Sequence, residues 1–268
     1  MADRTVTVIS TNLLTSLGGT VSAGDSVFID RYSIDYVAGT DRSAADLILV
    51  MIGPEFGGTF DGAGALVLVC DQTSTGKFIN NGGGKIVRVR SSSGAGVIWQ
   101  IEIGPTGGSC QTHVDTCTTT NLVGTAGENF LHTAFTGTTG FIYGGNFTHD
   151  ESGVAMTTLN IWGGKWDEYC DITTVNLYNG EFNAMIVTVS PTTVNQHGGK
   201  FGCRNIGNIG TYNGNAGVWD LRGLSHKITV TTANLAPGLT ILKDKNTDRL
   251  LTITTTNTLY GPPKIIYS

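Results

Sequence analysis

The sequence predicts an all-β fold, a right-handed parallel β-helix (β-solenoid) with non-repeat β segments at both ends. Three observations lead to this expectation. Glycine is abundant, at 38 of 268 residues, and charged residues make up only 14%. Short stretches rich in threonine, valine and aromatic residues recur along the chain, which favours strands. A motif also returns at intervals of roughly 15–20 residues, a spacing typical of stacked repeats.

Three copies of this repeat are nearly alike. They read TTLNIWGGKW at 157–166, TTVNLYNGEF at 173–182 and TTVNQHGGKF at 192–201. Degenerate copies lie at 143–147 and 212–216. Each copy is an extended stretch, a Gly-Gly or Asn-Gly break and a second extended stretch. Because one unit cannot bury its own apolar face, we expect successive units to stack as coils.

The glycines of the motif are expected at the turns. Glycine adopts positive φ without steric cost, so it suits a tight reversal between two strands. We assign this role to Gly58, Gly145, Gly164, Gly180, Gly199 and Gly214.

Stacking predicts columns of equivalent side chains, about 4.8 Å apart from coil to coil. The first column is aromatic and holds Phe147, Trp166, Phe182 and Phe201, with Ala216 at its end. The second is an asparagine ladder of Asn160, Asn176 and Asn195, whose amides can bond from coil to coil. The third is polar and holds Asn146, Lys165, Glu181, Lys200 and Asn215. Packing alone explains these repeated residues, without an active site.

The domain organisation follows from where the motif begins and stops. Residues 1–55 are expected to form an N-terminal β cap or attachment region. Residues 56–223 are the expected solenoid, with an irregular insertion at about 104–138. Residues 224–268 are expected to form a C-terminal β cap or an oligomerisation or attachment segment. Within this segment, 239–242 and 250–254 should form a β-hairpin around a polar loop.

Composition excludes several partners. The net charge is -5 and no basic block occurs, so we expect no nucleic acid. The longest apolar runs, at 47–52 and 65–70, are too short to cross a bilayer, so we expect no membrane. The N-terminus shows no apolar leader, and the five scattered cysteines fit free thiols made in a reducing cytosol.

No catalytic, cofactor-binding or metal-binding residue is predicted, and no cofactor is expected. Cys110, His113 and Cys117 form the one cluster with metal-type residues, but no second pair completes a four-ligand zinc site. We therefore interpret this stretch as a polar loop with two incidental thiols.

Acidic residues offer a second possibility. Asp150 and Glu151 are adjacent, as are Asp167 and Glu168, so each pair points to opposite faces of a strand. Glu181 could approach Asp167 or Glu168 from the next coil. A solvated face with ion pairs between coils is the simpler explanation, since any solenoid stacks charges in this way.

The motif Thr-Thr-Val-Asn-Leu-Tyr-Asn-Gly-Glu-Phe resembles the irregular right-handed parallel β-helix repeats of bacteriophage virion proteins. These include capsid decoration or cement proteins, head fibres and tailspikes. The resemblance covers 141–216, with weaker support at 56–60 and 82–86. It implies a homotrimer that binds the major capsid protein or another virion protein. It also implies a location in the virion after synthesis in the host bacterial cytoplasm.

The expected function is therefore a non-enzymatic, structural one. We expect a capsid decoration or cement protein that stabilises the shell as a homo-oligomer. The alternative is a tailspike-like module that binds or degrades polysaccharide, acting through Trp162, Asp167, Glu168 and Glu181. Tailspike depolymerases are typically much longer and carry a separate particle-binding head. A bacterial surface adhesin is disfavoured because no export signal is visible.

Overall fold

The computed structural model describes most of the chain in two compact units, residues 1–138 and 139–268. The described residues are 2–7, 16–19, 22, 24–31, 48–61, 76–81, 86–90, 97–104, 111–115, 118–132, 135–150, 156–186 and 189–268.

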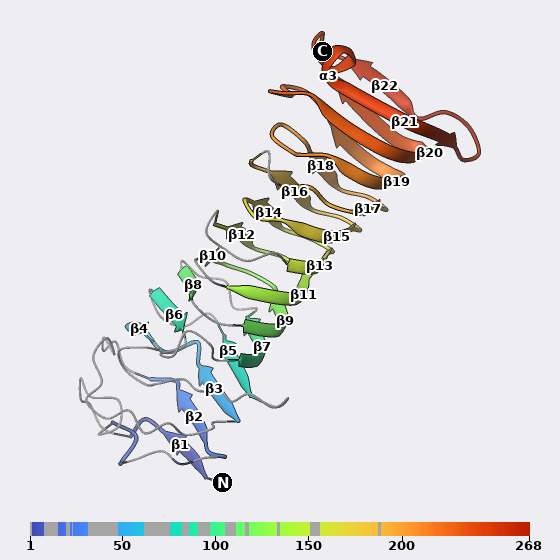
Figure 1. The fold of residues 1–268 in the computed structure, drawn as a ribbon. Helices are drawn as coiled ribbons and strands as arrows, with labels where there is room; N and C mark the ends of the chain where they lie inside the picture. Colours follow the sequence, from blue (N-terminus) through green and yellow to red (C-terminus); the bar gives the residue numbers. More distant parts are fainter. Residues whose placement is uncertain are drawn as a thin grey trace. The chain divides into compact units, whose positions relative to one another are not determined.

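Unit 1 stacks its strands in two parallel ladders (Figure 1). The first ladder joins β1 (Asp3–Thr5), β2 (Ser26–Ile29), β3 (Leu49–Ile52), β5 (Lys77–Asn80), β7 (Val97–Ile103) and β9 (Thr118–Gly124). The second joins β4 (Thr59–Asp61), β6 (Ile86–Arg90), β8 (Gln111–Asp115) and β10 (Glu128–Leu131). From β3 onward, each described coil contributes one strand to each ladder.

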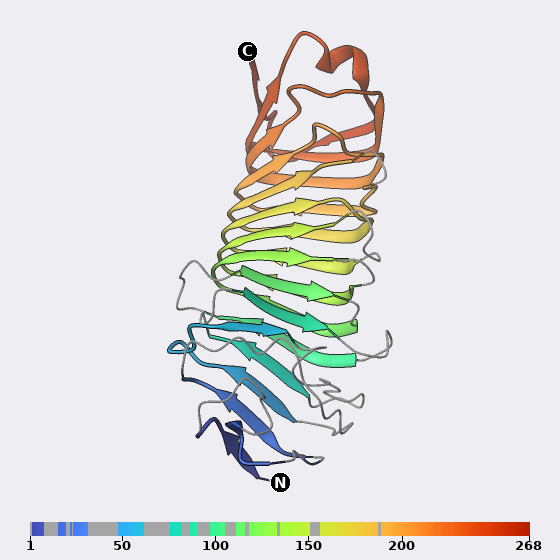
Figure 2. The ribbon, with the colours of Figure 1, turned by 90° about the vertical axis from the view of Figure 1, so that its left-hand side faces the viewer.

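Unit 2 has the same plan (Figure 2). Its first ladder joins β11 (Thr136–Ile142), β13 (Met156–Ile161), β15 (Ile172–Leu177) and β17 (Thr193–Gln196). Its second joins β12 (Asn146–His149), β14 (Lys165–Glu168), β16 (Glu181–Ala184) and β18 (Lys200–Gly202). Both ladders continue onto β19 (Ile209–Asp220) and β20 (Ile228–Lys243), and end at β21 (Leu251–Thr258) and β22 (Lys264–Tyr267). The fold is the parallel β-solenoid that the sequence predicts.

The core lies inside the coils. Strands such as β3, β5, β14 and β16 alternate half-buried and buried residues, so every second side chain points inward. Phe60 and Phe78 fill the interior of unit 1, and Trp166, Phe182 and Trp219 fill that of unit 2. Each coil covers the apolar side of the next, as stacked repeats require.

Strand pairing does not change at the predicted domain boundaries. β1, β2 and β3 already pair in parallel before residue 56, and β20 continues the ladders after residue 223. The predicted hairpin is wrong, because β21 runs parallel to β20, with Asn234 opposite Asn257. The connection contains a one-turn helix, α3 (Thr247–Leu250). The hydroxyl of buried Thr247 donates to Leu221 O over 3.2 Å and holds this turn against the coil beneath.

The predicted insertion at 104–138 is also wrong for the residues that the structure describes. β8, β9 and β10 lie within it and continue both ladders of unit 1. The threonines of β9 belong to an ordinary strand, with Thr119 buried and Thr118 half-buried. Threonine is β-branched and suits a pleated strand, so a threonine-rich stretch is no sign of irregular structure.

Four of the six predicted turn glycines adopt the left-handed conformation. The φ angles are 82° at Gly145, 76° at Gly164, 78° at Gly180 and 66° at Gly199. The stack adds a second constraint, because a Cβ on Gly180 would lie only 2.6 Å from Gly164 O. Any larger residue would therefore meet both an unfavourable φ and the backbone of the preceding coil.

The other two glycines have different roles. Gly58 is buried directly before β4 and is not among the glycines with positive φ. Gly214 lies inside β19, where an added Cβ would be 2.6 Å from Leu239 Cδ2 and 2.7 Å from Tyr212 Cε1. Its small size leaves room for these two side chains. The turn in this coil is at Gly217, with φ of 90°.

The structure places the predicted columns in register, apart from their ends. Phe147 pairs with Trp166, Trp166 with Phe182 and Phe182 with Phe201. The next member is Trp219, and the predicted Ala216 instead pairs with Gly238. Likewise, Lys200 is followed by Val218, and Asn215 is outside the polar column. The ends differ because the prediction aligned Gly214 with Gly199. In the structure Gly214 pairs with Gln196, and Gly217 is the glycine that lies against Gly199.

The asparagine ladder is longer than predicted. Asn160, Asn176 and Asn195 are joined by amide hydrogen bonds of 2.9 and 2.8 Å. The ladder then continues through Asn213, Asn234 and Asn257 with bonds of 2.7, 2.6 and 2.7 Å. In each bond, Nδ2 donates to Oδ1 of the preceding coil, and Asn160 itself donates to Gly140 O. The chain of amides therefore has one direction.

Candidate functional site

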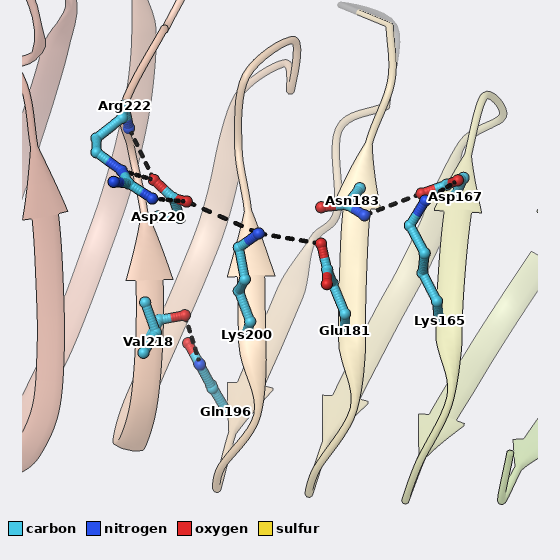
Figure 3. Close-up of polar contacts among 9 residues, drawn as sticks. All are labelled: Lys165, Asp167, Glu181, Asn183, Gln196, Lys200, Val218, Asp220 and Arg222. Carbon is cyan, nitrogen blue, oxygen red and sulfur yellow. Dashed lines mark hydrogen bonds and ion pairs between the residues drawn. The ribbon is translucent and has the colours of Figure 1, made fainter. Parts of the chain in front are cut away.

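A polar groove of about 350 Å³ lies on the outer face of the second ladder of unit 2, and it is the main candidate site. It crosses β14, β16, β18 and the end of β19 (Figure 3). Ala184, Met185 and Gly202 supply its small and apolar surface. The polar lining residues are Lys165, Asp167, Glu181, Asn183, Lys200, Arg204, Asn205 and Asp220.

The period of two along each strand brings these side chains to one face. Lys165 and Asp167 both point outward from β14, and Lys165 Nζ donates to Asp167 Oδ2 over 2.7 Å. Asn183 on β16 donates from Nδ2 to Asp167 Oδ1 over 2.9 Å. Lys200 on β18 donates to Glu181 Oε1 over 3.0 Å. These bonds tie three successive coils together along the groove (Figure 3).

The groove ends at a third ion pair. Arg222 binds Asp220 with two bonds, of 2.8 Å from Nε and 2.9 Å from Nη2, and Lys200 Nζ lies 3.9 Å from Asp220 Oδ2. The hydrogen bond from Arg222 lowers the pKa of Asp220, and the charge of Lys200 adds to this effect. The hydrogen bond to Asp167 raises the pKa of Lys165. Both pKa shifts favour the ionised forms, of Asp220 and of Lys165, at neutral pH.

The partners limit what the groove can do chemically. Asp167, Glu181 and Asp220 each accept a hydrogen bond from a cation, so their carboxylates are already engaged within the groove. Arg204 is exposed and has no ion-pair partner in the part of the chain that the structure describes. The groove is therefore suited to hold a polar ligand by hydrogen bonds, with one guanidinium available for an anionic group.

Two residues of the expected glycan-binding face lie elsewhere. Glu168 is fully buried inside the coil, because it follows the inward-pointing Trp166 by two residues. Trp162 is exposed but does not line the groove. It stacks with Tyr143 at 5.0 Å and with Tyr178 at 4.9 Å between ring centroids, and Tyr178 stacks with His197 at 5.0 Å. We call these four rings, Tyr143, Trp162, Tyr178 and His197, the outer aromatic ladder.

A buried polar cluster that we did not predict lies inside unit 2. His149, Glu168 and Cys170 offer ligand-type atoms that all lie within 4.8 Å of one another. His149 Nδ1 is 2.8 Å from Glu168 Oε1, and both side chains are fully buried. Trp166 Nε1 donates to Glu168 Oε2 over 3.0 Å, and the Cys170 backbone N donates to Oε1 over 2.8 Å.

The electrostatics of this cluster favour a charged imidazole in the absence of a metal ion. Burial disfavours the charged form of His149. Hydrogen bonding to Cys170 and to Glu168, and the charges of these groups, outweigh burial and raise the pKa of His149 to about 10. A thiol, an imidazole and a carboxylate together also occur in nucleophilic catalysis. Cys170 is only 5% exposed, however, so a substrate cannot reach it here.

The sequence contained a signal for this cluster. Phe147 and His149 are two residues apart, as are Trp166, Glu168 and Cys170, so the inward aromatic column predicts inward neighbours. A second buried polar group had no such signal. Gln196 lies where the preceding coil has Leu177. Its side-chain oxygen accepts a hydrogen bond from the Tyr212 hydroxyl. Its Nε2 donates to Val218 O (Figure 3).

The remaining candidate residues from the sequence can be placed only in part. Cys110, Cys117 and Glu151 lie outside the described residues. His113 is described and stacks on His132, with Nδ1 2.8 Å from His132 Nε2. Among the described residues, no helix has the length and apolar character needed to cross a membrane.

Comparisons with protein-family models, with curated proteins and with solved structures find no match to this chain.

Proposed function

We propose that this chain is a non-enzymatic structural protein of a bacteriophage particle, a capsid decoration protein that works as a homo-oligomer. Two features support the proposal. The repeat resembles those of virion β-helices, and its repeated residues are used in stacking. The carboxylates of the groove each accept a hydrogen bond from a cation, as expected of ion pairs that fasten neighbouring coils.

The exposed last coil of unit 2, formed by β21 and β22, is the observation that carries this proposal. The described chain exposes eight large hydrophobic residues, and five of them lie in or beside this coil: Leu259, Tyr260, Ile265, Ile266 and Tyr267. Ile265 continues the column of buried Ile241 but is 48% exposed. An open strand edge next to apolar side chains is a surface that proteins normally cover. A second copy of this chain is the occupant that we propose.

The oligomer mass tests this assignment. Ile265→Asp places a charge on the open end, and we expect it to convert the oligomer into monomers in size-exclusion chromatography with light scattering. Tyr178→Asp is the matched control. Tyr178 is exposed to a similar degree, at 40%, but lies on the outer aromatic ladder. A monomeric parent protein, or an oligomer that persists in Ile265→Asp, would contradict the proposed contact.

The location of the chain tests the virion assignment separately. Antibodies against the full chain should label the heads of purified phage particles from cells that produce it, and electron microscopy shows where the label lies. Label confined to tails would point to a tail fibre or tailspike. Particles without label would refute a virion role.

A second candidate function, the binding of polysaccharide, rests on the groove. Its amides and charged groups come from four successive coils, and such groups can bind sugar hydroxyls and carboxylates. Binding of the intact protein to a panel of acidic and neutral polysaccharides would test it. We expect Arg204→Ala to weaken the binding of acidic glycans in particular, with Lys245→Ala as a control for loss of surface charge. Release of reducing sugar would show degradation, and the absence of binding across the panel would exclude this function for the panel.

A further inference from the structure

We propose that the buried cluster of His149, Glu168 and Cys170 is a zinc site that fastens two successive coils of unit 2. His149 lies at the end of β12, whereas Glu168 ends β14 and Cys170 follows it. The three ligand atoms lie within 4.8 Å of one another. A metal ion there would join neighbouring coils from the inside.

The donor set fits zinc. Zinc in proteins is bound by cysteine sulfur at about 2.3 Å, by histidine nitrogen at about 2.0 Å and by carboxylate oxygen at about 2.0–2.2 Å. Neighbouring ligands of a tetrahedral ion are then separated by somewhat less than 4 Å, so small side-chain movements bring this cluster into range. Softer thiolate and imidazole donors together disfavour magnesium and calcium.

The surroundings supply the rest of the site. Asp150 O lies 2.7 Å from Cys170 Sγ and is an oxygen donor next to the thiol. The Glu168 carboxylate is oriented by Trp166 Nε1 and by the Cys170 backbone N. Outer hydrogen bonds of this kind orient metal ligands and increase affinity.

Charge balance is compatible with a divalent ion. The cluster is enclosed by the aromatic column of Phe147 and Trp166, so a net charge would be costly. Zn²⁺ with one thiolate, one carboxylate and one neutral imidazole has a net charge of zero. His149 Nδ1 and Glu168 Oε1 lie 2.8 Å apart and would separate to bind the ion.

Metal analysis of the intact, tag-free chain tests the proposal. Protein produced in zinc-supplemented medium and freed of loosely bound ions should contain about one zinc ion per chain, measured by plasma mass spectrometry. Refolding with Co²⁺ in place of Zn²⁺ should give thiolate-to-cobalt absorption in the near ultraviolet. Parent protein that folds without bound zinc and shows no cobalt–thiolate band would overturn the proposal.

Two variants identify the ligands. Cys170→Ser should lose the cobalt–thiolate band and most of the zinc. Cys203→Ser is the matched control, because Cys203 is a buried thiol of the same unit that accepts a hydrogen bond from Trp219. It should keep both signals. A Cys170→Ser protein with undiminished zinc would refute this site.

The cysteine pair Cys110 and Cys117 needs its own control, because a metal there would also give a cobalt–thiolate band. The double variant Cys110→Ser/Cys117→Ser should retain one zinc ion. If it loses the metal, the proposal for His149, Glu168 and Cys170 is wrong. If Cys170→Ser does not fold, the signals of this double variant and of Cys203→Ser still decide the question.

Discussion

Single residues in this protein are constrained by the coil next to them as much as by their own backbone. Gly180 shows this most clearly. It needs positive φ for the turn, and it also lies against Gly164 O of the preceding coil. Both requirements exclude a side chain.

We therefore expect Gly180→Ala to lower the free energy of unfolding by about 1–3 kcal/mol, from the left-handed backbone together with the close approach. Asn179→Ala, at the adjacent exposed turn position, should change it by less than about 0.5 kcal/mol. Urea unfolding followed by tryptophan fluorescence measures both. Equal stabilities of the two variants would show that the stacked backbone tolerates a methyl group at 180.

Asp220 makes stability depend on pH. Its hydrogen bond with Arg222 lowers its pKa in the folded state, so the ionised form favours folding. This contribution is present above the unfolded pKa of about 3.9 and is lost as pH falls through the lower folded value. Asp220→Asn should thus lower the free energy of unfolding by on the order of 1 kcal/mol at pH 7, and should leave it almost unchanged near pH 2. A cost that is the same at both pH values in urea titrations would argue against the ion pair.

Elements in the chain are joined by ladders, and the asparagine ladder is the one whose contribution can be isolated. Asn176 donates to Asn160 and accepts from Asn195, so its removal takes one hydrogen-bond partner from the buried Asn160 oxygen and one from the Asn195 amide nitrogen. Asn257 only donates, to Asn234, and it is exposed.

We expect Asn176→Ala to lower the free energy of unfolding by about 1–3 kcal/mol, and Asn257→Ala to lower it by only about a few tenths of that amount. Thermal unfolding of the two variants beside the parent protein measures the difference. If the end and the middle of the ladder matter equally, the amides act independently of one another.

The ladders also show which features a sequence can predict. The columns from Phe147 to Phe201 and from Asn160 to Asn195 follow from spacing, because identical motifs must stack in register. The ends of these columns were misplaced, since Asn213-Gly214 looks like a turn while the turn is at Gly217. A local motif does not reveal which of two nearby glycines, Gly214 or Gly217, forms the turn.

The candidate site was less accessible to such reasoning. Glu168 was expected on a solvated face, yet its position two residues after Trp166 sends it inward. The groove depends on which rotamers bring Lys165, Asn183 and Lys200 to shared carboxylates. Spacing places these side chains on one face but does not choose their partners.

At the scale of the whole molecule, stability is distributed coil by coil. Each coil of unit 2 contacts its neighbours, so a change at one end should stay local while a change in the middle affects the full unit. Ile253→Ala, at a half-buried position of β21, should reduce amide protection in β21 and β22 alone. Trp166→Ala, in a fully buried position, should lower the free energy of unfolding by about 3–5 kcal/mol. It should also reduce amide protection throughout β13–β18.

Hydrogen exchange with mass spectrometry distinguishes the two outcomes. If Ile253→Ala reduced protection as far away as β13, the unit would unfold as one block rather than coil by coil.

The hydrogen bonds of the asparagine ladder also align the dipoles of its side-chain amides. All six side-chain amides point the same way, so their dipoles add along the stack in the manner of a helix. The positive end is directed to the Gly140 carbonyl, and the negative end is the Asn257 oxygen at the surface. The exposed face of β21 should therefore attract N–H groups or cations and repel carboxylates.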